Sequence, residues 1–274
     1  MSLVSISEGI RAGLALKRHV VCFTGTSNDQ GLKSISDLLS HMDNPAVPSP
    51  QACSIDSLPD TETQDGISCY LVPYSGTAEI DYELQNRFAL WLHKSTVPVI
   101  LVLQDNPLMI PYLRHQFWFA CGEDMGQWQD SVVAESIVDS VYMHHSIRRY
   151  ILDLIVHLRM HRLSKPSQGG GAHSRSLSDM TLLCKWIALS SGSSFITPDM
   201  VQTACERYFP WHLQLIESSK EDPSVMYGSQ EELVDELINR FDTFAIKMAQ
   251  EYKNPLFKQL CIVQSVMKDI IPAT

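Results

Sequence analysis

Apolar runs in the first half of the chain alternate with amphipathic segments. Val20–Phe23, Ile67–Tyr74 and Val97–Gln104 are apolar and rich in β-branched or aromatic residues, which predicts three buried strands. Apolar residues recur at helical spacing from about Asn28 onward and again over 77–95, which predicts a helix between each pair of strands. Because this alternation is typical of α/β folds, we predict that the three strands run parallel in one sheet.

Weaker patterns flank these strands. Apolar residues at helical spacing over 3–18 predict a short helix before the first strand. The stretch 44–66 is rich in Pro, Ser and Asp, which predicts loops around one short strand near Ala52–Ile55. Beyond about Ala120 the apolar spacing is helical throughout, so we expect the sheet to end there.

The chain beyond the sheet is predicted to be a series of amphipathic helices. We expect a compact helical unit from about Ser146 to Leu215, with Trp186 and Phe195 buried in it. Within this unit, Thr197–Pro198 combines an N-cap residue with a proline at the first helical position, which is a helix start signal.

A polar linker over 217–228 separates the last two predicted helices from this unit. Ser229 and Glu232 form a capping box ahead of a long helix. The predicted buried face of that helix consists of Leu233, Leu237, Phe241, Ala245 and Met248. We therefore expect an α/β core at 1–130, a helical lid at 131–216 and C-terminal helices at 217–274.

Composition narrows the class of protein. With 274 residues, 45% of them hydrophobic, the chain can bury substantial cores, and its net charge of −10 argues against broad adhesion to DNA or anionic lipid. The seven cysteines are scattered singly without a C-x-x-C pair, so no zinc site or disulfide framework is indicated. No apolar stretch reaches the roughly 18 residues of a membrane span, so we expect a soluble protein that does not contact membranes.

The stretch "VVCFTGTSNDQGLKSISDLL" has the outline of a phosphate-binding P-loop with altered spacing. A working P-loop reads G-x-x-x-x-G-K-[ST], because its backbone N–H groups and its Lys and hydroxyl surround the phosphates and Mg²⁺. Here one extra residue separates Gly25 from Gly31, and another separates Gly31 from Lys33 and Ser34. Asp29 adds a carboxylate where phosphates would lie, so the pattern predicts a vestigial nucleotide site.

The helical part carries a resemblance to a known family. "GGGAHSRSLSDMTLLCKWIALSSGSSFITPDMVQTACERYFPWHL" resembles the lid of the MoxR and magnesium-chelatase branch of AAA+ ATPases. Gly171, Ala172, Ser174 and Arg175 match the family's G-A-S-P-R block, and 195–201 matches its T-P-x-x-V block. The resemblance implies that Arg175 reaches toward a nucleotide γ-phosphate. The alternative is that it pairs with an acid where lid and core meet.

The helix "RRYILDLIVHLRMHR" resembles one in the fungal maintenance-of-telomere-capping family, which consists of AAA-like proteins with eroded motifs. The resemblance implies a P-loop NTPase-like parallel sheet core followed by a C-terminal all-helical lid. It also implies an intracellular fungal protein, cytoplasmic or nuclear, linked to telomere capping or chromosome maintenance.

The chemistry of that family is missing from the predicted core. The second predicted strand should end in two carboxylates, one for Mg²⁺ and one for the attacking water, and it ends in Pro73 and Tyr74. Glu79 and Asp81 follow, and we interpret them as surface acids of the next helix.

Two further family positions are represented. "LVLQDNP" resembles the family's sensor strand, with Gln104 or Asn106 at its tip, and "YLRHQF" places Arg114 near the arginine-finger position. No G-x-S-x-G, H-E-x-x-H or G-x-G-x-x-G motif supplies other catalytic chemistry.

A basic cluster precedes the glycine-rich stretch. It consists of Arg148, Arg149, His157, Arg159, His161 and Arg162. These residues are either the ordinary polar face of a core helix or a patch for phosphate or nucleic acid.

We therefore expect a non-catalytic AAA-like interaction or scaffold protein. The alternatives are an ATPase with a rearranged P-loop and a DNA-associated factor that uses the basic lid face. The non-catalytic interaction protein requires no cofactor. Weak binding of ATP and Mg²⁺ would use Gly25, Gly31, Lys33, Ser34 and Arg175. We expect protein partners, including self-association, whereas nucleic acid is disfavoured by the net charge.

Overall fold

The computed structural model describes residues 3–40, 49–57, 67–74, 82–122, 135–252 and 254–272. The chain divides into two compact units. One comprises Leu3–Glu135, and the other comprises Ser136–Thr274 together with Met1–Ser2. Among the described helices, none has both the length and the apolar character needed to cross a lipid bilayer.

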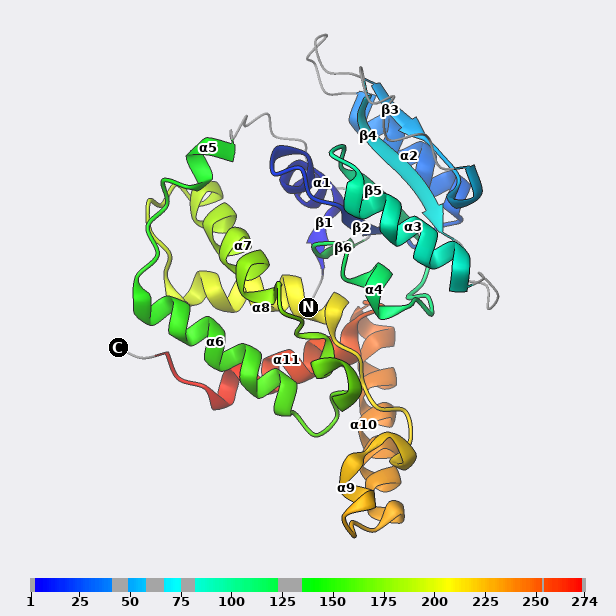
Figure 1. Cartoon of the computed structure of the whole chain (residues 1–274), viewed down its shortest axis with the longest axis vertical. Coiled ribbons are helices and arrows are strands. Elements are labelled where there is room, and N and C mark those ends of the chain that lie inside the picture. Colours follow the sequence, from blue (N-terminus) through cyan, green and yellow to red (C-terminus); the bar gives the residue numbers. More distant parts are fainter. Residues whose placement is uncertain are drawn as a thin grey trace. The chain divides into compact units, whose positions relative to one another are not determined.

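The first unit contains a six-stranded sheet in the order β1-β6-β2-β5-β4-β3, and all of its strands are parallel (Figure 1). The strands are β1 (Val4–Ser5), β2 (Val20–Phe23), β3 (Ser49–Ala52), β4 (Ile67–Tyr74), β5 (Val99–Leu103) and β6 (Ala120–Gly122). Strand β5 lies between β2 and β4 and pairs in parallel with both. This confirms the predicted parallel arrangement of the three strands.

Helices α1 (Ile6–Ala15), α2 (Asn28–Ser40) and α3 (Tyr82–Lys94) connect the strands. The chain moves toward β3 after β2 but back toward β6 after β4 and β5. Since parallel crossovers are right-handed, these opposite directions place α2 and α3 on opposite faces of the sheet. Every residue of β2 and β5 is therefore buried, as their continuous apolar character requires.

Two expectations about the sheet were wrong. The chain is not purely helical beyond Ala120, because β6 pairs with β2 and β1 there. No local sequence pattern predicts this pairing, which requires close approach of the segments that contain β1 and β6. A Cβ at Gly122 would lie 2.6 Å from the Cβ of Leu3. The strand expected near Ala52–Ile55 occurs earlier, as β3, and a 3-10 turn follows at Ile55–Ser57.

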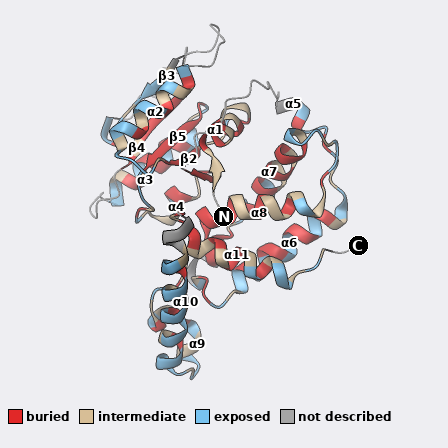
Figure 2. Cartoon of the chain, turned by 180° about the vertical axis from the view of Figure 1, so that it is seen from behind, coloured by how far each residue is buried: buried red, intermediate tan, exposed pale blue. Residues whose placement is uncertain are grey.

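The second unit is helical apart from two isolated bridges among its described residues. Its helices are α5 (Glu135–Val138), α6 (His145–Met160), α7 (Ser176–Ser190), α8 (Pro198–His212), α9 (Pro223–Met226), α10 (Glu231–Tyr252) and α11 (Phe257–Asp269), with 3-10 turns η2 (Pro166–Gly171) and η3 (Ser219–Glu221). Helix α8 packs against α7 and α11, and all three helices contain buried residues (Figure 2). Trp186 and Tyr208 are among the largest fully buried side chains. Thr197 is the N-cap of α8 and Pro198 is its first residue, as predicted.

The predicted domain boundaries follow residues 130 and 216. Residue 130, the expected end of the α/β core, lies outside the described residues. Helix α11 packs against both α6 and α8 within one compact unit. This packing does not test the predicted division into a lid at 131–216 and C-terminal helices at 217–274, which stays a prediction.

Trp186 is buried as predicted, but the prediction for Phe195 was wrong, since its side chain is 55% exposed. The backbone explains the difference. Tyr142 forms a parallel bridge with Phe195, in which Tyr142 N donates to Ser194 O and Ile196 N donates to Tyr142 O. Because side chains alternate along extended backbone, Ile196 turns inward and Phe195 turns outward.

The expected buried face of α10 was also wrong in part. Val234, Ile238 and Ala245 are buried, whereas Leu233 and Leu237 are exposed. Each exposed leucine precedes a buried residue and so lies about 100° around the helix from it. The apolar side chains of α10 therefore occupy a wider sector of the helix surface than the sector that is buried against the rest of the chain.

Candidate functional site

The carboxyl end of the central strands is the place where a nucleotide would bind in this fold. Phe23 at the end of β2 pairs with Leu103 at the end of β5. The chain leaves these neighbouring strands in opposite directions, toward β3 and toward β6, which defines a topological switch point. The loops after β2 and β5 therefore meet at the edge where ligands of open α/β sheets bind.

The loop after β2 is short. Thr24 N donates to Leu103 O at 3.0 Å and continues the strand pairing, and Gly25 follows with a φ of +61°. Helix α2 begins at Asn28, so only Thr24–Ser27 connect strand and helix. Gly31, Lys33 and Ser34 are consequently part of helix α2 and not of the loop.

Gly31 contributes to packing between α2 and the end of β2. A Cβ at this position would lie 2.5 Å from Oγ1 of Thr24. The N–H of Gly31 donates to Ser27 O at 2.9 Å in the first turn of the helix. This glycine therefore permits close approach of helix and strand, while its amide is already used in a hydrogen bond.

Lys33 and Ser34 lie on the outer side of α2. The sheet-facing stripe contains Gly31, Ile35 and Leu39, and Lys33 is two residues, or about 200°, from the first two of these. Both Lys33 and Ser34 are exposed. The hydroxyl of Ser34 donates to Gln30 O at 3.0 Å, one turn earlier in its own helix.

Strand β4 ends without a carboxylate. Pro73 and Tyr74 belong to the strand itself and pair with Val102 and Leu103. The Tyr74 hydroxyl donates to Leu108 O at 3.4 Å, and burial raises the pKa of Tyr74. A neutral phenol thus occupies the strand end, while the predicted surface acids Glu79 and Asp81 lie outside the described residues.

The loop after β5 contains a buried arginine contact. Nη2 of Arg114 donates to Oδ1 of Asn106 at 2.7 Å, and Arg114 is only 7% exposed. Burial lowers the pKa of Arg114 to about 10, which is still high enough for the guanidinium to be charged at neutral pH. The candidate finger residue Arg114 is therefore bound to the candidate sensor residue Asn106. Asp105 beside it is exposed.

In the helical unit, Arg175 is exposed and directly precedes α7. Its backbone N donates to Nδ1 of His173 at 3.3 Å, and Nε2 of the same imidazole lies 3.0 Å from the Tyr208 hydroxyl. That hydroxyl also lies 3.4 Å from Oγ of Ser176 and 3.4 Å from Oδ2 of Asp179. Burial, followed by the negative charge of Asp179, raises the pKa of Tyr208 well above its ordinary value, and the positive charge of Arg175 opposes this.

Sequence reasoning missed this polar cluster around Tyr208, which fixes the turn that carries Arg175. The available signal was Asp179, the one acidic residue in a helix that is mostly apolar. Of the predicted site residues, the structure places Gly25 in the loop after β2, and Gly31, Lys33 and Ser34 on α2. Arg175 belongs to the other compact unit, and its approach to Gly25 stays a prediction.

A central-strand loop at the switch point of a parallel sheet, together with a helical unit, defines this protein as a member of the P-loop ATPase-like α/β class. The chain belongs to the fungal family of maintenance of telomere capping protein 2. It is 98% identical to the protein of that name from Kluyveromyces lactis over 274 residues, which is 100% of both chains.

More distant similarity supports the same assignment. The protein of that name from Lachancea thermotolerans is 41% identical over 169 residues, which cover 60% of this chain and 59% of the relative. A crystal structure of a protein from Cytophaga hutchinsonii, assigned as an ATPase, superposes with a TM-score of 0.53 and 11% identity over 85% of this chain and 87% of that one. The structural match shows a shared fold only. No family model matches the chain.

Gly171, in the glycine-rich block that resembles the family lid, allows two backbone segments to touch. Its φ is +85°, and a Cβ at this position would lie 1.8 Å from His212 O at the end of α8. Gly192, after α7, has a similar φ of +70°, but a Cβ there would meet nothing within 4 Å. The two glycines share a left-handed backbone conformation and differ in what a Cβ would contact.

Gly171→Ala should therefore lower the free energy of unfolding by about 3 kcal/mol or more, because it adds overpacking against backbone to left-handed strain. Gly192→Ala should cost only about 1 kcal/mol, the cost of the strain alone. Urea denaturation followed by tryptophan fluorescence measures both. Equal costs would contradict the close approach of Gly171 to His212.

Proposed function

We propose that this protein is a non-catalytic AAA-like interaction protein that acts in the maintenance of telomere capping, in the nucleus, in the cytoplasm or in both. The name of its relatives, maintenance of telomere capping protein 2, supports the process. The retained P-loop ATPase-like fold supports a role based on shape, since the sheet and its helices persist while the residues at the carboxyl edge differ from those that hydrolysis needs.

The observation that carries the proposal is the end of β4. Hydrolysis of a nucleoside triphosphate requires one carboxylate for Mg²⁺ and a second group to orient the attacking water. Pro73 and Tyr74 occupy this strand end, and the Tyr74 hydroxyl is bound to Leu108 O. A proline and a hydrogen-bonded phenol do not fit either role.

The loop after β2 supports the same proposal. A phosphate cradle needs several free backbone N–H groups and a Lys that reaches the phosphates. Gly31 N–H donates to Ser27 O, and Lys33 lies on the face of α2 opposite the sheet-facing stripe. These residues do not fit a Mg²⁺-nucleotide centre of the family's kind. Residual, weak nucleotide binding, which is predicted to use Gly25, Gly31, Lys33, Ser34 and Arg175, is compatible with the proposal.

The competing reading is an ATPase with a rearranged loop. Such an enzyme would have to recruit Asp105, the exposed carboxylate that follows β5 at the same edge of the sheet. It would also need Lys33 to turn from the outer face of α2 toward the phosphates. Both residues can be replaced without disturbing buried contacts, because both are exposed.

We expect purified protein to show no Mg²⁺-dependent ATP turnover near the order of 1 s⁻¹ that is typical of working enzymes, because the groups that act together in hydrolysis are missing. Release of phosphate should be indistinguishable between the wild type, Lys33→Ala and Asp105→Asn. Turnover at about 1 s⁻¹ that disappears in both variants would show that the enzyme reading is correct.

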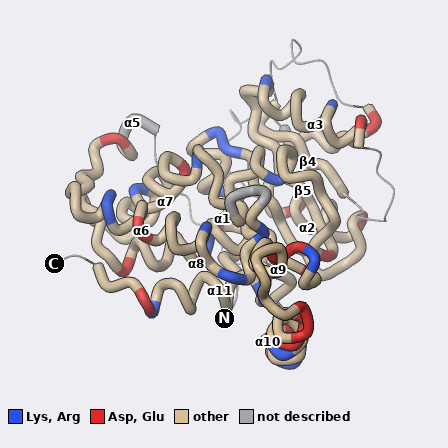
Figure 3. The backbone as a smooth tube through the Cα atoms, turned by 60° about the horizontal axis from the view of Figure 1, so that its bottom comes forward, with Lys and Arg blue, Asp and Glu red and all other residues tan. Residues whose placement is uncertain are grey.

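A second candidate function rests on the exposed face of α6. Arg148 and Arg159 are eleven residues, or about three turns, apart, so they lie on one side of the helix. Arg149 adjoins them, and all three are exposed. Figure 3 marks the Lys and Arg positions along the backbone in blue. We propose this basic face as a contact for the phosphate backbone of DNA, a local exception to the net charge of −10.

Arg148→Ala combined with Arg159→Ala should weaken DNA binding and lower the magnitude of the salt-dependence slope by about 2, since two phosphate contacts are lost. Arg87→Ala combined with Lys94→Ala, exposed bases on α3, is the matched control and should leave both quantities unchanged. Fluorescence anisotropy with labelled single-stranded and duplex DNA measures them. Identical loss in both double variants, or no binding by the wild type, would refute this function.

A further inference from the structure

Two buried thiols face each other in the unit that contains the sheet. Cys22 lies in β2 and Cys121 in β6, and the two residues are paired in register in these neighbouring strands. Their Sγ atoms lie 3.1 Å apart, both side chains are fully buried and both cysteines are free. Since the S–S bond of a disulfide is about 2.0 Å long, the two sulfur atoms need to approach by only about 1 Å to form one.

The backbone of the two strands meets the requirements of a disulfide. Neighbouring strands lie about 4.8 Å apart, and a disulfide spans Cα atoms that are about 4.4–6.8 Å apart. Cys22 and Cys121 are partners in a parallel pair, so their side chains project to the same face of the sheet. A bond between them therefore requires rotation of the side chains and no change of register.

Helix α1 covers Cys121. A Cβ at Gly9 would lie 2.8 Å from Sγ of Cys121, so the glycine leaves the room that this sulfur occupies. The segment that carries α1 is joined to β6 through β1, a strand of two residues at the edge of the sheet. Because short pairings near a chain terminus open most readily, Cys121 is the sulfur that a small oxidant reaches first.

Hydrogen bonds give the two thiols different roles. Sγ of Cys121 donates to Val21 O at 3.1 Å, so the S–H of Cys22 is the donor in the contact between the two sulfur atoms. Burial, followed by this hydrogen bond to Cys121, raises the pKa of Cys22 well above its ordinary value. Cys22 therefore keeps its proton until the other sulfur has reacted, and can then give that proton to a leaving group.

We propose that Cys22 and Cys121 form a reversible disulfide when the chain meets hydrogen peroxide. Sγ of Cys121, as the thiolate, attacks one oxygen of the peroxide, the O–O bond breaks, and hydroxide takes up the proton that Cys121 released and leaves as water. Sγ of Cys22 then attacks the sulfur of the resulting sulfenic acid. The S–S bond forms, the S–O bond breaks, and the hydroxyl group leaves as a second water with the proton of Cys22. The two thiols together lose two electrons, which reduce the peroxide.

The disulfide ties the edge of the sheet to β2. Strand β2 leads directly into the loop at the switch point, where Thr24 is two residues after Cys22. In compartments that keep thiols reduced, disulfides are usually transient and report on oxidation, and a pair that reacts only with peroxide suits that role. The proposal does not depend on whether the chain binds a nucleotide.

Peptide mapping of the native full chain tests the bond. The chain is treated with hydrogen peroxide, its remaining thiols are blocked with N-ethylmaleimide in denaturant, and the digest is analysed without reduction. We expect a linked pair of peptides that contains Cys22 and Cys121, and its loss after treatment with dithiothreitol. If both cysteines stay available to the maleimide under conditions that oxidise the less buried Cys53, the proposal is wrong.

Two alanine variants show whether the register-paired thiols are specific. Cys22→Ala should remove the linked peptides, and Cys121 should then be oxidised further to a sulfinic acid, because no neighbouring thiol reacts with its sulfenic acid. Cys69→Ala is the matched control and should leave the yield of linked peptides unchanged. Cys69 is also a buried strand residue of this sheet, but its strand β4 adjoins neither β2 nor β6. Equal loss in both variants, or a bond that forms only in urea, would overturn the proposal.

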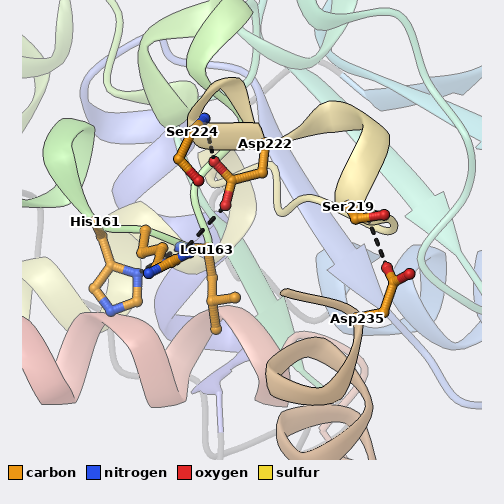
Figure 4. A network of polar contacts seen from close by, with 7 residues as sticks. His161, Leu163, Ser219, Asp222, Ser224 and Asp235 are labelled. Carbon is orange, nitrogen blue, oxygen red and sulfur yellow. Dashed lines mark hydrogen bonds and ion pairs between the residues drawn. The ribbon is translucent and has the colours of Figure 1, made fainter. Parts of the chain in front are cut away.

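Hydrogen exchange on the wild type supplies a second readout that needs no variant to fold. Oxidation should slow exchange of the β6 amides, because the disulfide opposes separation of β6 from β2. The N–H of Ser219 is the internal reference, since it donates to Oδ1 of Asp235 at 2.9 Å in the helical unit, a contact without sulfur (Figure 4). Exchange in β6 that oxidation leaves unchanged, or that slows no more than the reference does, would contradict the cross-link.

Discussion

The pairing of β2 with β5 is the contact on which the rest of the sheet unit depends. Both strands are buried along their whole length, so each needs strands on both sides and helices on both faces. Their register places Phe23 beside Leu103. This brings the loop that begins at Thr24 next to the loop that begins at Gln104, and ligands of open α/β sheets bind where such loops meet.

At that edge β4 ends in Pro73 and Tyr74 and not in carboxylates. Gly31 lets α2 approach Thr24 there, and in the other compact unit Gly171 lets the turn before α7 approach His212. Two groups that would contact phosphate or metal in a working site are hydrogen-bonded within the chain. Arg114 is bound to Asn106, and Ser34 is bound to Gln30. These contacts support the proposal of an interaction protein that has a P-loop ATPase-like fold.

The sequence predicted the elements whose burial shows in local pattern. Val20–Phe23 and Ile67–Tyr74 are continuous apolar runs, and both are strands with those bounds. Strand β6 could not be found in this way, because three residues carry no period and pair only through tertiary contact. Phe195 and Leu237 were misplaced for a related reason: apolar spacing identifies a candidate face, and only the neighbouring elements decide which part of it is covered.

The candidate site was predictable in outline, since the altered spacing between Gly25 and Lys33 and the strand end at Pro73 are visible in the sequence. The hydrogen bonds around Tyr208 were not, because His173, Asp179 and Tyr208 meet only once α7 and α8 pack. The same holds for the pairing of Arg114 with Asn106, which turns two catalytic-type residues toward each other.

The central claim is that the carboxyl edge of the sheet has lost the ability to hold a metal–nucleotide complex. Titration of the full chain with a fluorescent ATP analogue, with Mg²⁺ and with excess chelator, tests it most directly. We predict the same weak affinity in both conditions, because no strand-end carboxylate is available for the metal at β4. Tightening by about tenfold or more in the presence of Mg²⁺, equivalent to about 1.4 kcal/mol, would contradict the account.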